Sequence, residues 1–296
     1  FSETSGGSIF LHSLAHTLNA LGESAFIWPW GAPPNRNLSR TILKFLGKPE
    51  LPLKLDHTLP KLGTAPGFDT PQARYSDLQE NSIIVYPEVT LGNPLGGGNV
   101  VRWLLYTPGI KDPFEFTPNE IFFRAGEMSD LPDITGGAQD LYLWYIHPAY
   151  KNENRPNRSG TCYTLRKGHE KPRIPQTTNA ICIDGMSHAE TADIFNKCAE
   201  FYAYDEATFY SQYAALCGCL SIVVPGKYKS RQEWVKAHPL GRYGVAYGVD
   251  DTAHANATRG QVHAMLNQKV EDGVETVRAF IETTQNAFTG TNTPSA

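Results

Sequence analysis

An α/β protein with two parallel-sheet domains is the fold that this sequence predicts, and three observations predict it. Short apolar runs alternate with helical patterns through the second half of the chain, which is typical of a parallel sheet with helices on both faces. A glycine loop followed by a helix opens the first half. A polar segment, 151–160, separates the two halves, and 296 residues are enough for two domains of medium size.

The composition narrows the class of protein. Hydrophobic residues make up 41% of the chain and charged residues 19%, which is ordinary for a globular protein. A net charge of -4 without a long basic stripe argues against a nucleic-acid partner. No apolar run reaches the roughly 18 residues that span a bilayer, so we expect no transmembrane segment. Peripheral attachment to a membrane through a modest patch is compatible with this composition.

Five cysteines, an odd number, all lie in the second half of the chain: Cys162, Cys182, Cys198, Cys217 and Cys219. This pattern fits reduced, buried thiols better than a disulfide framework, and we expect a cytoplasmic compartment. Cys217 and Cys219 have no second close-spaced pair that would complete a metal site.

The first element predicted is a helix over Ser8–Leu21, where apolar residues recur at helical spacing until Gly22. Gly6 and Gly7 precede it, and such glycines let backbone amides approach an anionic ligand at the helix N-terminus. A tight turn would need glycine as well. A strand over Ser24–Trp28 follows. The strand that should precede the loop is missing and there is no initiator Met, so we expect that the chain begins inside a longer sequence.

Residues 29–79 are rich in proline and glycine, and we interpret them as a long irregular excursion from the sheet. A buried strand over Ser82–Tyr86 follows, and Glu88 lies just beyond its end. Three glycines then precede a predicted helix over Asn99–Tyr106. The carboxyl end of a strand is a favoured place for ligand contacts, so Glu88 is a candidate acid or base. A solvated loop acid is the alternative.

Two further short strands are predicted, at Ile121–Phe123 and Leu141–Ile146. His147 follows the second strand directly. A histidine there can act as a base or bind a phosphate or hydroxyl group, although most histidines in that position do neither. His147 is therefore the second acid/base candidate.

The segment Lys151–Gly160 is polar, charged and proline-bearing, and we expect an interdomain linker there. A strand over Gly160–Leu165 opens the second domain, and Arg166 and Lys167 follow it. Two adjacent cations at a strand end can neutralise a diphosphate, because Arg supplies a planar fork of donors and Lys a compact charge. A basic pair on a surface loop is the alternative.

A strand at Ala180–Ile183 and a helix that begins after Asp184 or Ser187 and continues to Lys197 lead to the most informative stretch, Phe201–Pro225. This stretch predicts a strand (201–203), a polar turn, a helix (208–216) and a second buried strand (220–224). Five polar residues then lie where a parallel sheet presents its ligands, at a strand's carboxyl end and the next helix's N-terminus: Tyr204, Asp205, Glu206, Thr208 and Ser211. An ordinary capped helix explains the same residues without a ligand.

At this point most of the chain resembles the glycosyltransferases of the GT-B fold, in which two Rossmann-like domains face a cleft and a sugar leaves a nucleotide-sugar donor. It looks most like bacterial transferases of polysaccharide assembly, whose signature is matched by Tyr204, Asp205, Thr208, Tyr210, Ser211 and Ala214. Retaining members often carry two glutamates eight positions apart. Counted back from Gly218, these positions hold Asp205 and Tyr213. The second acid, which usually holds the ribose in the family, is absent, and retaining or inverting stereochemistry stays open.

The resemblance implies an acceptor-side domain, residues 1–155, and a nucleotide-sugar-binding domain, residues 156–296, with a closing helix at Val274–Ile281. In the donor site it implies that phosphates are bound by Arg166, Lys167, Thr208 and Ser211, with Tyr210 beside them. It implies that Gly6 and Gly7 lie by the cleft and that Tyr204, Asp205 and Glu206 contact the donor sugar or ribose. The catalytic candidates are Asp205, Glu206, His147 and Glu88.

The mechanism implied by the resemblance needs no metal or other cofactor, because helix-terminal amides and basic side chains stabilise the departing nucleoside diphosphate. The sequence has no Asp-x-Asp carboxylate pair. The acceptor would be a glycan or glycolipid. Two alternatives stay open: a nucleotide-sugar epimerase of the same fold, which needs no acceptor, and a non-catalytic module that binds a glycan or another partner and no nucleotide.

Overall fold

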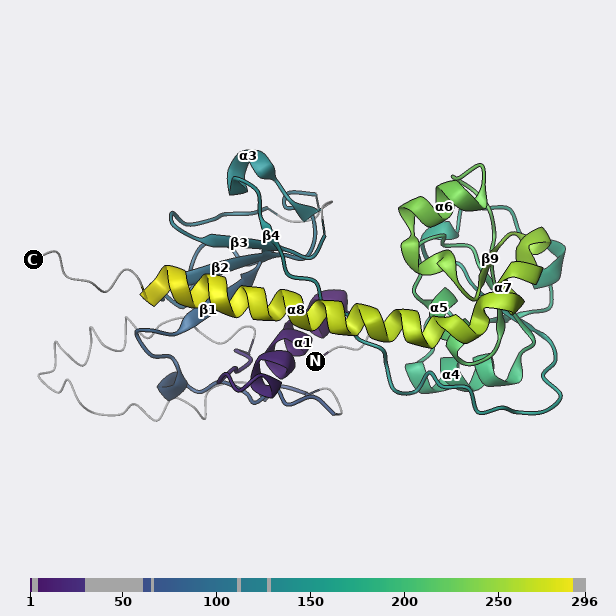
Figure 1. The fold of residues 1–296 in the computed structure, drawn as a ribbon, viewed down its shortest axis with the longest axis horizontal. Coiled ribbons are helices and arrows are strands. Elements are labelled where there is room, and N and C mark those ends of the chain that lie inside the picture. The colour runs from purple at the N-terminus through teal and green to yellow at the C-terminus, as the bar shows by residue number, and fades with distance from the viewer. Residues whose placement is uncertain (2–4, 30–60, 65–66, 111–112, 127–128, 290–296) are drawn as a thin grey trace, which may run out of the picture. The chain divides into compact units, whose positions relative to one another are not determined.

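The computed structural model describes residues 1, 5–29, 61–64, 67–110, 113–126 and 129–289. Contacts along the chain divide it into two compact units (Figure 1). Unit 1 comprises Phe1–Tyr145 and Val270–Ala296, and unit 2 comprises Ile146–Lys269. Each unit contains a sheet in which every neighbouring pair of strands is parallel, so the predicted α/β class with two parallel sheets is confirmed.

Unit 1 holds a four-stranded sheet in the order β1-β2-β3-β4. Its strands are β1 (Ile83–Pro87), β2 (Asn99–Leu104), β3 (Ile121–Arg124) and β4 (Gln139–Asp140). Its helices are α1 (Gly6–Ala20), α3 (Pro132–Thr135) and the C-terminal part of α8 (Val262–Thr289), and a 3-10 turn covers Tyr75–Asp77. The core joins α1 and α8 to the sheet through Leu14, Val101, Trp103, Phe123, Leu141, Leu143, Val277 and Phe280.

The prediction of a helix over Asn99–Tyr106 is wrong. Residues Asn99–Leu104 form β2, which pairs with β1 and β3. Val101 and Trp103 pack on the core that includes α1 and α8, whereas Val100 packs on the other face of the sheet. A parallel strand buried on both faces has a continuous apolar run, which resembles a buried helix in sequence. Arg102 interrupts that run, and its side chain is fully buried.

Two other strands predicted in unit 1 do not form. The stretch Ser24–Trp28 makes a single parallel bridge, from Ile27 to Gln72. The stretch Leu141–Ile146 follows β4 without ladder pairing, although Leu141 and Leu143 are buried. Of the predicted excursion at 29–79, residues 30–60 and 65–66 lie outside the described residues.

Unit 2 holds a five-stranded parallel sheet in the order β6-β5-β7-β8-β9. Its strands are β5 (Thr161–Thr164), β6 (Ile181–Cys182), β7 (Glu200–Ala203), β8 (Leu220–Val223) and β9 (Val245–Tyr247). Its helices are α4 (His188–Lys197), α5 (Tyr210–Leu216), α6 (Arg231–Ala237), α7 (Thr252–Thr258) and the first residues of α8. Short 3-10 turns cover Arg166–Gly168, Pro175–Thr177, Pro239–Arg242, Val249–Asp251 and Arg259–Gln261.

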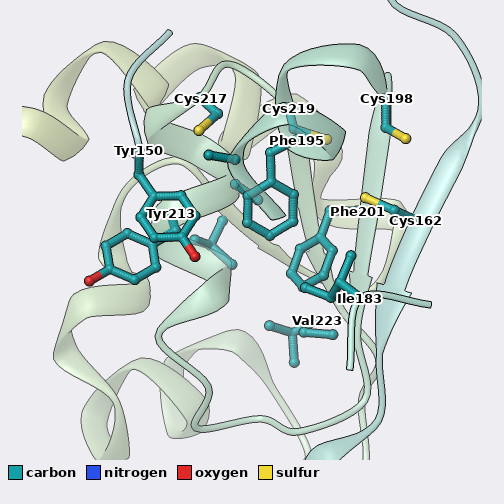
Figure 2. Packing of buried hydrophobic residues seen from close by; sticks show 14 of the residues in the cluster. Tyr150, Cys162, Ile183, Phe195, Cys198, Phe201, Tyr213, Cys217, Cys219 and Val223 are labelled. Carbon is teal, nitrogen blue, oxygen red and sulfur yellow. The ribbon is translucent and has the colours of Figure 1, made fainter. Parts of the chain in front are cut away.

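Side chains alternate between the two faces of this sheet. Phe201 of β7 packs with Phe195 of α4 and with α5 and α6 on one face, where Figure 2 shows the aromatic and thiol side chains together. Tyr202 packs with Ala255 of α7 on the other face. The period of two along a strand therefore builds two cores, one on each side of the sheet.

The expected linker, Lys151–Gly160, belongs to unit 2 rather than separating the domains at 155. Asn196 of α4 accepts from the Glu153 amide at 2.9 Å and donates to the Lys151 carbonyl at 3.0 Å. The Arg158 guanidinium donates to the carbonyls of Phe195 (2.7 Å) and Cys217 (2.6 Å). Polar composition suggested a free linker, but these polar side chains fasten the segment to unit 2.

The closing helix is longer than Val274–Ile281 and serves both units. Val262 and Leu266 pack in the core of unit 2, whereas Val277 and Phe280 pack in the core of unit 1. Residues from Val270 onward therefore belong to unit 1, not to the C-terminal domain as expected.

Candidate functional site

The strand order of unit 2 places a reversal of direction at β5. The chain passes from β5 to β6 on one side and then returns to β7 on the other side. In doubly wound sheets, ligands bind outside the carboxyl ends of the strands at such a switch point. The segments to consider are those that follow β5, β6 and β7.

Arg166 follows β5 in an unusual backbone conformation. Its φ angle is 42°, in the left-handed region that residues other than glycine rarely adopt. Asp184, just after β6, holds the turn in place: one carboxylate oxygen accepts from the Thr164 hydroxyl, and the other from the amides of Leu165 (2.9 Å) and Arg166 (3.3 Å). Backbone strain that the surroundings stabilise in this way is concentrated at functional sites in proteins.

Gly168 ends the turn against the segment that follows β7. A Cβ atom added to Gly168 would collide with the carbonyl group of Tyr204 and would lie 2.7 Å from the Asp205 amide nitrogen. Only glycine allows this approach, so the turn after β5 is fixed to the loop after β7 as well as to Asp184.

These segments line a hollow of about 580 Å³, here called the switch-point hollow. Its lining residues are Leu165, Arg166, Lys167, His169, Asp184, Gly185 and Tyr210. The Arg166 guanidinium lies over the Tyr210 ring, 5.4 Å from its centroid. Within the described residues, no carboxylate pairs with Arg166 or Lys167, whereas the exposed His169 contacts Glu170 at 2.9 Å. Two cations are therefore available to an anionic ligand at the switch point.

Three residues predicted for the donor site thus lie together, namely Arg166, Lys167 and Tyr210. Tyr204 is elsewhere: its side chain is fully buried, and its hydroxyl contacts the Ile174 amide (3.0 Å) and the Thr177 hydroxyl (2.6 Å). Tyr204 is part of the core beneath the turn and does not line the hollow.

Asp205 and Glu206 shape the backbone. The Asp205 carboxylate accepts from the Ala207 amide at 3.0 Å, which closes a local turn. The Glu206 carboxylate accepts from the amides of Gly226 and Lys227 and from the Tyr247 hydroxyl at 2.8 Å. Burial works to raise the Glu206 pKa, but these hydrogen bonds and the nearby Lys171 hold it below its ordinary value. Glu206 therefore ties the loop after β8 to the sheet.

Thr208 and Ser211 lie at the start of α5. The Thr208 hydroxyl accepts from the Tyr210 amide at 3.3 Å. The Ser211 side chain is buried at 2% exposure, and its hydroxyl has no hydrogen-bond partner among the described residues. Neither residue lines the switch-point hollow.

His147 belongs to a group of rings on the α4 and α5 side of unit 2. Its ring stacks on His188 at 4.3 Å, and the Tyr150 hydroxyl lies 2.6 Å from the His188 Nδ1. Tyr150 in turn stacks on Tyr213 at 3.7 Å, as Figure 2 shows for these two rings. Burial raises the Tyr150 pKa far above its ordinary value, so its hydroxyl keeps its proton. The ring stacking and this hydrogen bond give the group a packing role.

The candidates in unit 1 lie near one another. The buried Glu88 carboxylate accepts from the Leu105 amide at 2.9 Å, which ties together the ends of β1 and β2. Gly6 and Gly7 begin α1, capped by Ser5, and a Cβ on Gly7 would lie 3.7 Å from Leu105 Cδ1. The N-terminus of α1 and Glu88 thus both lie beside Leu105, at the carboxyl end of the sheet.

Sequence reasoning missed two residues that the structure brings forward: Asp184, which lines the hollow, and Gly168, which fixes the turn beside it. An acid directly after a predicted strand was a signal for Asp184, because β6 lies next to β5 in the usual doubly wound order. Gly168 gave no signal, since a close approach between two loops depends on tertiary structure.

All five cysteines are free, and four of them are buried. The described residues include no group of three or more His, Cys, Asp or Glu side chains suited to hold a metal ion. Among the described helices, none is long and apolar enough to cross a membrane.

Comparison of the chain with protein-family models, with curated proteins and with solved structures finds no match.

Proposed function

We propose that the protein is a glycosyltransferase of the GT-B type and that unit 2 binds the diphosphate of its nucleotide-sugar donor at the turn Arg166–Gly168. The observation that carries this proposal is the pair of cations, Arg166 and Lys167, at the switch point of a five-stranded parallel sheet. No carboxylate pairs with them within the described residues. Parallel α/β sheets bind nucleotides at that place.

The chemistry follows from the charge that develops when the donor breaks. As the bond between the sugar and the diphosphate lengthens, negative charge gathers on the leaving phosphate oxygens. The Arg166 guanidinium offers parallel donors to two such oxygens, and the Lys167 ammonium adds a compact charge. Fixed donors stabilise the transition state because they need no reorganisation during the reaction, and Asp184 and Gly168 fix this turn.

Unit 1 supplies the acceptor side in this proposal. Its sheet is also parallel, and Glu88 and the N-terminus of α1 lie at the carboxyl end of that sheet. A hydroxyl group of a glycan or glycolipid is the acceptor class that we propose, in surface polysaccharide assembly. We further propose a cytoplasmic location, where free thiols stay reduced.

The experiment is a transfer assay in EDTA with a panel of nucleotide sugars and a panel of glycan acceptors, read by mass spectrometry. We expect release of a nucleoside diphosphate that depends on the acceptor and falls at least tenfold in Arg166→Ala and Lys167→Ala. Lys236→Ala, which removes an exposed lysine from α6, is the matched control and should leave the rate unchanged.

Two other results would reject the proposal. A donor that is isomerised without any acceptor would identify an epimerase. A folded protein that binds none of the nucleotides would identify a binding module instead.

A further inference from the structure

We propose that Asp184 accepts a hydrogen bond from a ribose hydroxyl of the donor, so that the ligand of the switch-point hollow is a ribonucleotide and not a deoxyribonucleotide. This inference rests on the proposed function, because it assumes that a nucleotide binds beside Arg166 and Lys167. In the family that the chain resembles, an acid usually holds the ribose, but Tyr213 occupies that position here. The inference assigns this role to Asp184 instead.

The position of Asp184 supports this role. β6 pairs in parallel with β5 through Cys162 and Ile181 and through Tyr163 and Cys182, so the two strands end at the same edge of the sheet. Asp184 and the cations Arg166 and Lys167 line the same hollow. In doubly wound sheets the phosphate lies at the turn after one strand, and an acid beyond the neighbouring strand contacts the ribose.

The carboxylate of Asp184 also has capacity for a ligand. A carboxylate offers about four acceptor positions. The Leu165 and Arg166 amides share one oxygen, and the Thr164 hydroxyl occupies one position on the other. One position therefore remains, on the oxygen that Thr164 contacts.

The surroundings leave this position accessible. Asp184 is an exposed residue, and the next residue in the lining is Gly185, which has no side chain to cover it. A Cβ atom added to Gly185 would meet nothing within 4 Å, so the space beside Gly185, the neighbour of Asp184, is open. The volume of about 580 Å³ lies within the usual range of roughly 300–1,000 Å³ for a small-molecule site.

A purely structural Asp184, which only shapes the turn, predicts something different. Loss of the turn would weaken every nucleotide alike, because the phosphates are common to all of them. A carboxylate that accepts from a ribose hydroxyl binds ligands with this hydroxyl more tightly than ligands that lack it. With a deoxy ligand, the carboxylate oxygen loses its hydrogen-bond partner, which lowers the affinity.

The experiment is calorimetric titration of the full chain in EDTA with ADP, GDP, CDP and UDP, followed by the 2′-deoxy and 3′-deoxy forms of the tightest ligand. The wild type should bind the ribose form about tenfold more tightly than at least one deoxy form. Asp184→Asn should bind the ribose form about tenfold more weakly and should bind that deoxy form as the wild type does.

Asp184→Asn preserves the turn, because the Asn oxygen can accept from the two amides and its nitrogen can donate to Thr164. The matched control is Asp193→Asn on α4, which removes a carboxylate that pairs with Arg155 and Lys197. Asp193 does not line the hollow. The control should keep the tenfold preference for the ribose form.

Each contrary result has one meaning. Equal binding of the ribose and both deoxy forms by the wild type, which needs no variant, would reject the inference and leave the proposed function intact. The Asn amide can itself donate to a ribose hydroxyl, whereas Ala cannot, so a preference that persists in both Asp184→Asn and Asp184→Ala would reject Asp184 as its source. The absence of any nucleotide binding by the folded wild type would reject the proposed function itself.

Discussion

At the scale of single residues, the candidate site depends on Arg166, a residue whose backbone conformation is costly. A residue other than glycine in the left-handed region costs about 1–3 kcal/mol when it is strained. Arg166 carries this cost, whereas glycine at the same position would not, and its φ of 42° lies beside the switch-point hollow. The sequence pointed to Arg166 by its charge and its place after a strand. It could not indicate the conformation, which depends on Asp184.

The conformation of Arg166 gives a stability test. We expect Arg166→Gly to have a free energy of unfolding about 1 kcal/mol higher than Arg166→Ala, because glycine adopts positive φ without strain. At Lys167, where φ is negative, the order should reverse. Denaturant unfolding of the four variants measures this, and an unchanged order at the two positions would contradict the assigned backbone.

Arg102 shows how a buried charge supports unit 1. Its guanidinium pairs with Glu120 at 2.7 Å, and it donates to the carbonyls of Thr90 (2.6 Å) and Gly92 (2.8 Å). We expect Arg102→Met to lower the free energy of unfolding by about 3–5 kcal/mol, since the buried Glu120 loses its partner.

The control for Arg102 is Arg278→Met, which breaks an exposed ion pair with Glu275 in α8. Such a pair contributes about 0–1 kcal/mol. Similar losses in the two variants, measured by urea unfolding, would show that Arg102 is not buried as described.

Glu206 should make stability depend on acidity. Its folded pKa lies below the ordinary value of 4.5, so the unfolded state binds the proton more readily. The stabilisation is complete above pH 4.5 and is lost as the pH falls through the folded pKa. In Glu206→Gln, stability at pH 7 should fall by about 1–3 kcal/mol, and the difference from the wild type should shrink below pH 4.5. A difference that stays constant from pH 7 to pH 3 in thermal unfolding scans would contradict this role.

At the scale of elements, the prediction succeeded where local signals agree with the fold. The helix α4 was expected to begin after Asp184 or Ser187, and Ser187 caps it in a reciprocal pair with Glu190. The prediction failed at β2, because burial on both faces removes the alternation that marks a strand. It also missed β9 and α7, which are short and depend on packing against β8.

The turn after β5 provides a test at this scale. Gly168→Ala should lower the free energy of unfolding by more than about 2 kcal/mol, because the methyl group meets the Tyr204 backbone and not a flexible side chain. Gly126→Ala, where an added Cβ meets nothing within 4 Å, should change stability by less than about 1 kcal/mol. Thermal unfolding measures the stability of both variants. Equal effects would mean that the turn after β5 does not contact the loop after β7.

At the scale of the whole molecule, the sequence predicted two parallel-sheet units but not their boundaries. The segment Lys151–Gly160 looks like a linker in composition, yet Asn196 fastens part of this segment to unit 2. The helix α8 has one continuous apolar pattern, and only the partners of Val262 and Phe280 reveal that its two ends belong to different cores. Local patterns carry no information about which core a residue joins.

The most direct test of the central claim is calorimetric binding of nucleoside diphosphates in EDTA to the wild type and to Arg166→Ala/Lys167→Ala, at two salt concentrations. We expect one nucleoside diphosphate to bind the wild type, with affinity that falls as salt rises because the contacts are between charges. The double variant should bind at least about tenfold more weakly and with less dependence on salt. Equal affinity in the two proteins, or no binding to the folded wild type, would contradict the assignment of this turn as the diphosphate site.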